Sequence, residues 1–106
     1  MTMHLVIGAG GLIGQALLRE LRRRGLPAQG TDQRPGGSDL LLDLGAPERF
    51  TPPAGTGVAF LCAGTGGVEA CATSPEATAR INVTGTLHVA GRLAKAGYRL
   101  VYLSSS

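Results

Sequence analysis

The sequence predicts a doubly wound parallel α/β sheet of about five strands, on three observations. Short apolar runs alternate with segments of helical periodicity along the chain. Glycine clusters follow the first and the fourth apolar run, at 8–14 and 64–67. The 17 glycines and 4% aromatic residues indicate many tight turns and a core of small aliphatic side chains, which suits a sheet covered by close-packed helices. A chain of 106 residues suits one such domain, and no repeat or interdomain linker interrupts it.

The first strand and the first helix are predicted on either side of the first glycine cluster. His4–Ile7 is an apolar run of the kind that a parallel sheet buries on both faces. The helix begins among the glycines and runs to about Arg24, where Gly25 is the expected C-cap and Pro27 the stop.

The periodicity of this helix predicts which side faces the sheet. Ile13, Leu17 and Leu21 recur every four residues and form the inward stripe. The outward side carries polar residues, namely Gln15, Arg19, Arg22 and Arg23.

Four further strands are predicted, at Ala28–Asp32, 39–44, 58–62 and 98–103. The crossover at 46–50 is expected to form little more than a helical turn, because Pro52 and Pro53 follow it.

A long helix is predicted before the last strand. Ser74 is its expected N-cap and Pro75 its first residue, and it runs to about Ala96 with Gly97 as the cap. Its apolar residues cover roughly 200° of the helical wheel, about twice what one buried face requires. Something besides its own sheet is therefore expected to cover it. Asn82 lies inside this apolar arc, where an amide needs hydrogen-bond partners.

Three glycine patterns compete for the first cluster. A P-loop needs Gly-Lys-Ser/Thr, and no lysine is present there. The pattern GxGxxG fits Gly8 and Gly10 but has Ile13 at its third position. The pattern GxxGxxG fits Gly8, Gly11 and Gly14, where a chain that grips a dinucleotide pyrophosphate needs residues without side chains.

Asp32 strengthens the dinucleotide interpretation, because it ends the second predicted strand, eighteen residues after Gly14. A carboxylate at this place can accept hydrogen bonds from an adenosine ribose. It repels a 2′-phosphate, which favours NAD over NADP. Arg34 keeps NADP as the alternative, and Asp32 as a plain turn residue is the other interpretation.

The motifs of the chain occur in a recognisable order. After the first glycine cluster and Asp32 come Asp43-Leu44, Leu61-Cys62-Ala63-Gly64, Ser74-Pro75-Glu76, Asn82-Val83-Thr84-Gly85-Thr86 and Leu100-Val101-Tyr102-Leu103-Ser104-Ser105. In this order they resemble the extended short-chain dehydrogenase/reductase family, the NAD-dependent epimerases and dehydratases that mostly act on nucleotide sugars. The resemblance spans the whole chain and implies a Rossmann-like fold.

The resemblance also implies roles for residues outside the glycine cluster. Asp43 and Leu44 would meet the adenine, and Asn82 would steady the site from the long helix. Asp43 can instead simply end a strand, and Cys62 can be a small core residue without chemistry. Besides Asp32 and Arg34, the other cofactor contacts come from the two glycine-containing loops: Gly8, Gly10, Gly11, Leu12, Ile13, Gly14, Cys62, Ala63 and Gly64.

The catalytic groups of that family are incomplete in this sequence. The resembling enzymes move a hydroxyl proton with a Tyr-x-x-x-Lys pair and a nearby Ser or Thr. The only lysine, Lys95, precedes both Tyr98 and Tyr102, so no such pair exists. Ser105 and Ser106 stand where the family's catalytic Ser or Thr follows the fifth strand. We therefore expect an incomplete domain, truncated before its substrate-binding part and inactive by itself.

The expected function is the NAD-binding half of an epimerase- or dehydratase-type oxidoreductase. The alternatives are a non-catalytic NAD(P)-binding sensor or dimerisation module, an NADP-dependent reductase of the same family, and a similar fold that binds no nucleotide. The resembling family pairs through its long helix, which implies a homodimer through residues 74–96.

Composition and charge argue against other classes of function. The net charge is +3, but four arginines crowd the end of the first helix without interleaved aromatic residues, which indicates a solvated face rather than a nucleic-acid site. The sequence shows no signal peptide and no long apolar run, so we expect a cytoplasmic protein without a membrane partner. Cys62 and Cys71 lack histidines at ligand spacing, so no metal is expected.

Overall fold

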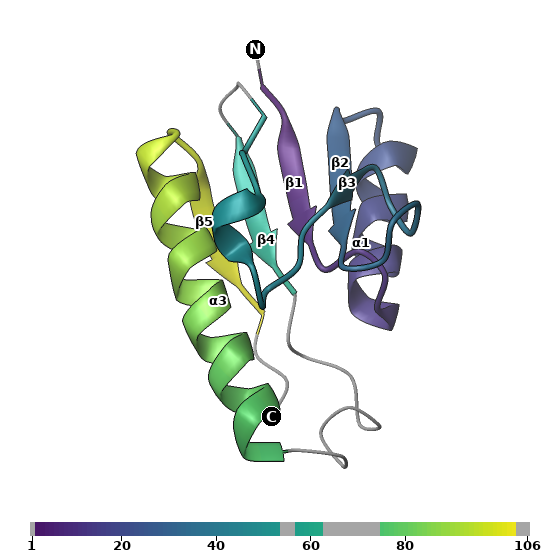
Figure 1. Ribbon diagram of the computed structural model, residues 1–106. Helices are drawn as coiled ribbons and strands as arrows, with labels where there is room; N and C mark the ends of the chain where they lie inside the picture. The colour runs from purple at the N-terminus through teal and green to yellow at the C-terminus, as the bar shows by residue number, and fades with distance from the viewer. Residues whose placement is uncertain (1, 54–56, 63–74, 104–106) are drawn as a thin grey trace.

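The structure, a computed structural model, describes residues 2–53, 57–62 and 75–103, and only the backbone of 75–82. Its centre is a parallel sheet of five strands (Figure 1): β1 His4–Ile7, β2 Ala28–Asp32, β3 Leu40–Leu41, β4 Val58–Leu61 and β5 Arg99–Tyr102. The strands lie in the order β3-β2-β1-β4-β5. This Rossmann-like arrangement confirms the predicted fold class. The strand order reverses at β1, and sheets of this kind bind ligands at that point.

Helices cover the two faces of the sheet, as Figure 1 shows. α1 Leu12–Arg23 covers one face, where Val6 of β1 packs with Leu18 and Leu21. α3 Pro75–Lys95 and the short 3-10 helix η1 Pro47–Arg49 cover the other. The core on that side contains Leu5, Ile7, Leu42, Phe50, Ala59, Leu61, Val89, Leu93 and Tyr98.

The side that α1 turns to the sheet only partly coincides with the predicted stripe, because Leu21 is buried as predicted and Ile13 is not. Leu18 and Leu21 are buried with Gly14, whereas Ile13 is 49% exposed and Leu17 is only partly buried. Gly14 packs its backbone directly against the glycine loop, and this contact fixes the rotation of the helix. Ile13 lies about 100° around the axis from Gly14 and so points away from the sheet.

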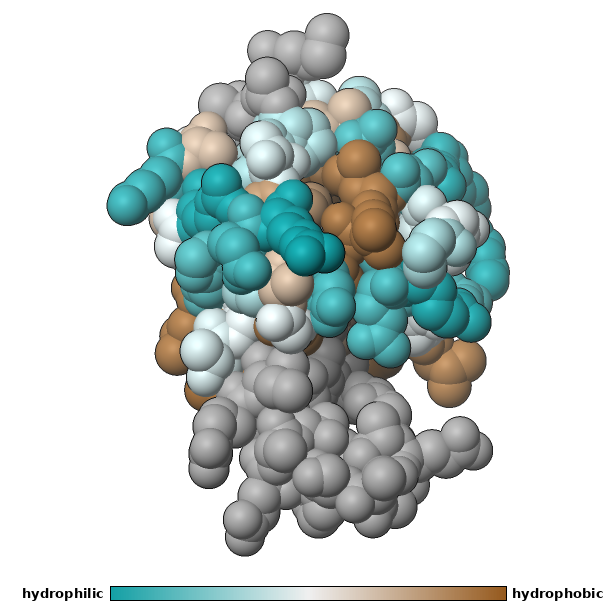
Figure 2. All heavy atoms as spheres, in the orientation of Figure 1, coloured by the Kyte–Doolittle hydropathy of each residue, from teal (hydrophilic) through white to brown (hydrophobic). Residues whose placement is uncertain are grey.

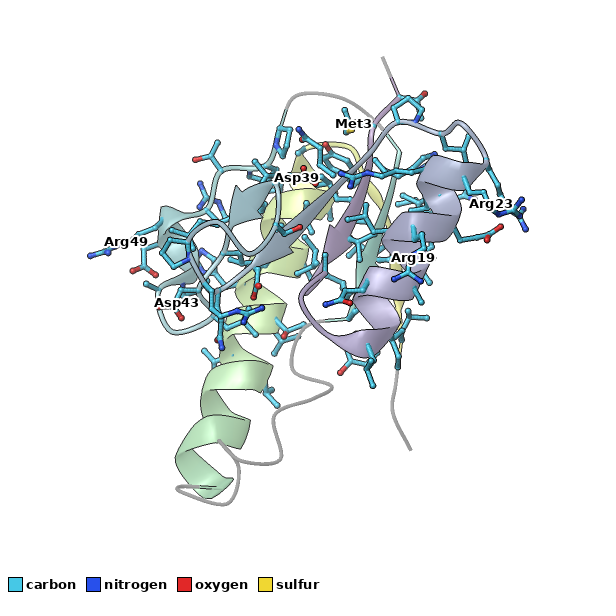
Figure 3. All side chains as sticks on the ribbon, turned by 90° about the vertical axis from the view of Figure 1, so that its right-hand side faces the viewer. Met3, Arg19, Arg23, Asp39, Asp43 and Arg49 are labelled. Carbon is cyan, nitrogen blue, oxygen red and sulfur yellow. The ribbon has the colours of Figure 1, made fainter. Side chains whose placement is uncertain are left out.

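The outward side of α1 agrees with the prediction. Gln15 and the arginines of this helix are exposed, and Figure 3 shows Arg19 and Arg23 projecting from it. Arg23 and Arg24 both bond to the carboxylate of Glu20, with Nε–oxygen distances of 3.0 and 2.8 Å. These two hydrogen bonds lower the pKa of Glu20 to about 2.

β3 has only two residues, where the sequence predicts a strand at 39–44. Before it, the carboxylate of Asp39 accepts the N–H of Gly30 at 2.9 Å, so a side chain replaces a backbone partner. After it, the carbonyl oxygen of Asp43 accepts the N–H of Ala46 at 2.9 Å and turns the chain out of the sheet. The bounds of the other four strands agree with the prediction to within one residue.

The predicted crossovers and helix ends are confirmed where the structure describes them. Gly25 and Gly97 follow α1 and α3 with φ of +75° and +102°, left-handed conformations that favour glycine. The segment at 46–50 contains only the single turn η1, which Arg92 of α3 holds by donating to the carbonyl oxygens of Glu48 and Phe50 at 3.0 and 2.6 Å. The predicted N-cap, Ser74, lies outside the described residues.

Within the described ranges, no helix is both long enough and apolar enough to cross a bilayer. The same ranges contain no group of three His, Cys, Asp or Glu side chains that could hold a metal ion.

Candidate functional site

Those predicted site residues that the structure describes gather at the carboxyl edge of the sheet. Because all five strands are parallel, the loops that follow β1 to β4 leave from the same edge (Figure 1). The glycine cluster follows β1, Asp32 ends β2, Asp43 follows β3 and Cys62 follows β4. α1 and α3 also begin on this side of the sheet.

A side chain at any of three glycines in the first cluster would be strained or would collide with a neighbour. Gly8 has φ of +90°, in the left-handed region. A Cβ on Gly14 would overlap the carbonyl oxygen of Gly8, and a Cβ on Gly10 would lie 2.5 Å from Oδ2 of Asp32. The fold therefore requires glycine at Gly14 and favours it at Gly8, whereas a side chain at position 10 would have to displace the carboxylate of Asp32.

Gly11 differs from its neighbours. A Cβ there would meet only the carbonyl oxygen of Gly8, at an ordinary contact distance of 3.9 Å. Gly11 is the N-cap of α1 and has φ of −83° and ψ of 171°, which any residue adopts. The fold does not require a glycine here, whereas a ligand that approaches the start of α1 closely would require one.

The start of α1 is suited to an anion. No described side chain caps it, and its first turn contains no acidic residue. The backbone N–H groups of its first turn are therefore available to a ligand. Together with the positive end of the helix dipole, they point toward the carboxyl edge, where the helix starts. Leu12, the first residue of the helix, is 89% exposed.

Thr31, which the sequence reasoning missed, joins β2 to the glycine loop. Its side chain is buried, and its Oγ1 accepts the N–H of Gly8 at 3.0 Å. Its carbonyl oxygen accepts the N–H of Ala9 at 2.7 Å. Both bonds position the loop against Asp32, the next residue. A hydroxyl residue directly before the acid that ends the strand is the signal that could have indicated this role.

The carboxylate of Asp32 is enclosed on three sides. It lies against Gly10 and against Gly37, where a Cβ on either glycine would overlap it. On the third side, Arg34 donates from Nε and Nη2 to the same oxygen, Oδ2, at 3.2 and 3.1 Å. Asp32 is consequently only 8% exposed. The structure thus brings together three residues that the sequence indicated, and it adds Gly37.

Asp43 and Leu44 form a turn at the end of β3. Asp43 is exposed (Figure 3), and its Oδ1 accepts the N–H of Gly45 at 2.9 Å, which leaves Oδ2 without a partner among the described residues. Leu44 packs on the core beneath α3. A Cβ on Gly85 of α3 would lie 2.8 Å from the Cβ of Leu44, so a glycine lets the helix rest on this turn.

Cys62 belongs to the core on the α1 side, where it is 3% exposed. Burial raises the pKa of its thiol, so the group stays neutral. Its N–H donates to the carbonyl oxygen of Ile7 at 2.8 Å. These observations agree with a small core residue.

Other predicted residues lie outside the described part of the chain. These are Ala63, Gly64, Ser105 and Ser106. Asn82 is placed by its backbone only, in the first half of α3.

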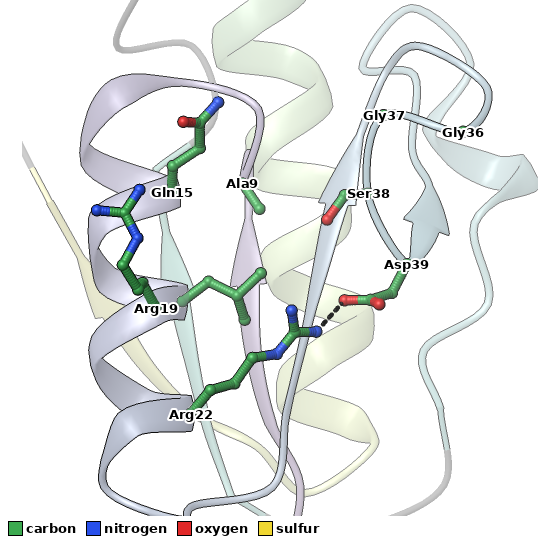
Figure 4. Close-up of a pocket in the computed structure, with 9 residues that line it drawn as sticks. Ala9, Gln15, Arg19, Arg22, Gly36, Gly37, Ser38 and Asp39 are labelled. Atoms are coloured by element: carbon green, nitrogen blue, oxygen red, sulfur yellow. Dashed lines mark hydrogen bonds and ion pairs between the residues drawn. The ribbon is translucent and has the colours of Figure 1, made fainter.

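A pocket of about 470 Å³ adjoins Asp32, between α1 and the loop after β2 (Figure 4). Gly37 both lines this pocket and contacts the carboxylate of Asp32. The one carboxylate in the pocket lining, Asp39, already accepts a hydrogen bond from Arg22 at 2.6 Å. Arg19 also lines the pocket, and it bonds to no described residue.

Comparison with known proteins assigns the chain to a family. No curated protein matches the sequence. The model of the NAD dependent epimerase/dehydratase family matches residues 4–106, a span that contains the glycine loop, Asp32, Arg34 and α3. The chain belongs to this family of NAD(P)-dependent proteins and is an NAD(P)-binding domain of the oxidoreductase type.

Proposed function

We propose that this chain binds NAD at the carboxyl edge of its sheet, as the N-terminal half of the cofactor-binding domain of a sugar-nucleotide epimerase or dehydratase. The observation that carries the proposal is the carboxylate of Asp32 against Gly10, beside the start of α1. The pyrophosphate would bind the N–H groups at that helix start, over Gly11. The hydroxyls of the adenosine ribose would donate to Asp32.

Exposed apolar side chains support this assignment. Leu12 and Ile13 are 89% and 49% exposed at the start of α1, and a bound cofactor would remove part of this apolar surface from water. We propose that Asp43 accepts a hydrogen bond from the adenine amino group and that Leu44 holds in place the turn that carries Asp43. The remaining proposed contacts are Cys62, Ala63, Gly64 and Asn82.

The purified 106-residue chain is expected to bind the cofactor and to oxidise no substrate. Its sequence contains no Tyr-x-x-x-Lys pair, which the proposed hydride transfer needs to move a hydroxyl proton. Ser105 or Ser106 is the proposed catalytic hydroxyl. Measurable substrate oxidation by the purified chain would contradict this expectation.

Calorimetric titration with NAD tests the proposed function. The wild-type chain should bind NAD, and Asp32→Asn should bind it about tenfold more weakly or worse, because hydrogen bonds to a charged acceptor are lost. Glu48→Gln is the matched control, since Glu48 is an exposed carboxylate on η1, and it should bind as the wild type does. Absence of binding by the folded wild-type chain would refute the proposal.

We further propose that two copies of the chain pair through α3. Val83 and Leu87 are 60% and 68% exposed on this helix, and Figure 2 shows hydrophobic side chains at the edge of the molecule where α3 lies. Pairing would bury this apolar surface. Sedimentation velocity should give a dimer for the wild type and for His88→Glu, and a monomer for Leu87→Glu. A wild-type monomer at high concentration would contradict the pairing.

A further inference from the structure

We propose that Arg92 of α3 is a positioning residue for the adenine side of the cofactor site, because it holds in place the turn that carries Asp43. The inference rests on the proposed function, in which Asp43 accepts a hydrogen bond from the adenine amino group. Nη1 of Arg92 donates to the carbonyl oxygens of Glu48 and Phe50 at 3.0 and 2.6 Å. These two residues belong to η1 and to its C-cap, which directly follow the turn 43–46.

The carbonyl oxygens of Glu48 and Phe50 need a side-chain donor, because the sequence ends η1 after a single turn. η1 is a 3-10 helix of only three residues. If it continued, the backbone N–H groups of positions 52 and 53 would be among the donors to these two oxygens. Both positions are prolines, Pro52 and Pro53, which have no N–H. The guanidinium of Arg92 therefore supplies the donor that the backbone lacks.

Backbone hydrogen bonds connect η1 to Asp43. The N–H of Arg49 donates to the carbonyl oxygen of Ala46 at 3.1 Å, and the N–H of Ala46 donates to the carbonyl oxygen of Asp43 at 2.9 Å. Figure 3 shows Asp43 and Arg49 on the same side of the molecule. A displacement of η1 would therefore move Ala46 and, with it, the backbone of Asp43.

α3 supports this segment at a second point. Gly85 precedes Arg92 by about two helical turns, so the two residues lie on the same side of the helix. A Cβ on Gly85 would lie 2.8 Å from the Cβ of Leu44, so the backbone of α3 rests on the turn. η1 lies beside α3 in Figure 1. One face of α3 thus holds both ends of the segment 44–50.

The carboxylate of Asp43 depends on this segment for its direction. Asp43 is exposed, and the one described group that donates to its carboxylate is the N–H of Gly45, inside the same turn. Asp32, in contrast, is enclosed by the glycine loop and by the turn after β2, and neither contacts η1. Loosening η1 should therefore disturb the adenine contact and leave the ribose contact intact.

The test is a calorimetric titration of the 106-residue chain with NAD and with nicotinamide purine dinucleotide, whose base has a hydrogen atom in place of the amino group. The wild type should bind NAD about five- to tenfold more tightly than the analogue, because the analogue cannot donate to the Asp43 carboxylate. Arg92→Met keeps an apolar stem and removes the donors. It should reduce this ratio to about twofold or less, chiefly by weakening NAD. Arg92→Lys keeps one charged donor group and should lie between.

Tyr98→Phe is the matched control, because Tyr98 holds the same connection after η1. Its hydroxyl donates to the carbonyl oxygen of Pro53 at 2.8 Å. Tyr98→Phe and Arg92→Met should both unfold at a lower urea concentration than the wild type. Only Arg92→Met should change the ratio of NAD to analogue affinity. An equal fall of the ratio in both variants would show that it follows general stability, and the inference would be wrong.

A double variant shows whether Arg92 acts through Asp43. Asp43→Ala should reduce the ratio to about one, because no carboxylate remains to discriminate. Adding Arg92→Met to Asp43→Ala should weaken NAD binding by less than about twofold further, since two changes that remove the same interaction are not additive. A further loss as large as that in the single Arg92→Met variant would overturn the inference.

The outcomes also separate this inference from the proposed function. Absence of NAD binding by the folded wild-type chain, with its circular dichroism intact, removes both. Equal binding of NAD and the analogue by the wild type removes the adenine contact of Asp43 and the inference, and it leaves the ribose contact of Asp32. A wild type that discriminates, together with an unchanged ratio in Arg92→Met, removes the inference alone.

Discussion

At the scale of single residues, the glycine loop contains positions that the fold needs and one that a ligand would need. Gly14 touches the backbone of Gly8, and Gly10 touches the carboxylate of Asp32. Gly11 has ordinary space around its Cα and an extended backbone. Substitutions at Gly14 and Gly11 should therefore affect different properties of the protein.

Gly14→Ala should destabilise the chain by about 1–3 kcal/mol, because its Cβ would force α1 away from the loop. Gly11→Ala should cost less than about 1 kcal/mol of stability, the range of an N-cap change, and should weaken NAD binding by about tenfold. Urea unfolding measures the first property and calorimetry the second. A Gly11→Ala chain with wild-type affinity for NAD would show that no ligand approaches this residue closely.

Glu20 should make the stability of the chain depend on pH. Its hydrogen bonds from Arg23 and Arg24 lower its pKa from the ordinary 4.5 to about 2. A lowered pKa in the folded state stabilises the fold above about pH 4.5, and this contribution disappears as the pH falls toward 2. Glu20→Gln should therefore melt at a lower temperature than the wild type at pH 7, and the difference should close between pH 4.5 and 2. A difference independent of pH would indicate another cause.

Asp32 was predictable at this scale, whereas its contacts were not. The alternation of apolar runs and glycine loops predicts the second strand, and Asp32 is the residue at its end. The contact with Gly37 and the hydrogen bonds from Arg34 depend on the path of a loop whose turn is set by one glycine with positive φ. Spacing along the sequence carries no information on that path.

At the scale of elements, α1 shows how a close backbone contact overrides a side-chain pattern. A stripe of Ile13, Leu17 and Leu21 is the natural interpretation of the periodicity. The helix rotates so that Gly14 meets the loop, and Leu18 becomes a buried residue beside Leu21. A hydrophobic pattern cannot predict this contact, because Gly14 has no side chain.

The rotation of α1 gives a direct comparison of two substitutions. Leu18→Ala should cost about 2–4 kcal/mol, because it opens a cavity between α1 and β1. Ile13→Ala should cost less than about 1 kcal/mol, because Ile13 lies mostly in water. Unfolding in urea checks both, and a larger cost for Ile13→Ala would restore the predicted stripe.

β3 was predicted too long for a related reason. Its sequence, with two aspartates around an apolar run, resembles a strand of six residues. Both aspartate side chains instead bond to backbone N–H groups, of Gly30 and of Gly45, and compete with the ladder at each end. A short β3 places the turn with Asp43 near the carboxyl end of β2.

At the scale of the whole molecule, the doubly wound parallel sheet was predicted from the alternation of apolar runs and helical segments, whereas the strand order β3-β2-β1-β4-β5 comes from the structure alone. The proposed cofactor would contact loops from β1, β2 and β3 at once. It would bind the folded chain only, since the unfolded chain does not bring those loops together.

Cofactor binding should therefore stabilise the entire domain. NAD at one hundred times its dissociation constant should raise the free energy of unfolding by about 2.7 kcal/mol. The unfolding midpoint in urea, measured with and without NAD, gives this value. Asp32→Asn at the same NAD concentration should gain much less, and an equal gain in both chains would contradict the role of Asp32.

The contact of Gly85 with Leu44 has a consequence for protein engineering. Replacing helical glycines by alanine commonly stabilises a protein by about 0.5–1 kcal/mol, and α3 offers two candidates. A Cβ on Gly91 would meet nothing within 4 Å, so Gly91→Ala should bring that gain. Gly85→Ala should instead push α3 off the turn that carries Asp43 and lower stability. A design procedure that ranks glycines by helix propensity alone would choose both, and only one of them should yield a more heat-resistant chain.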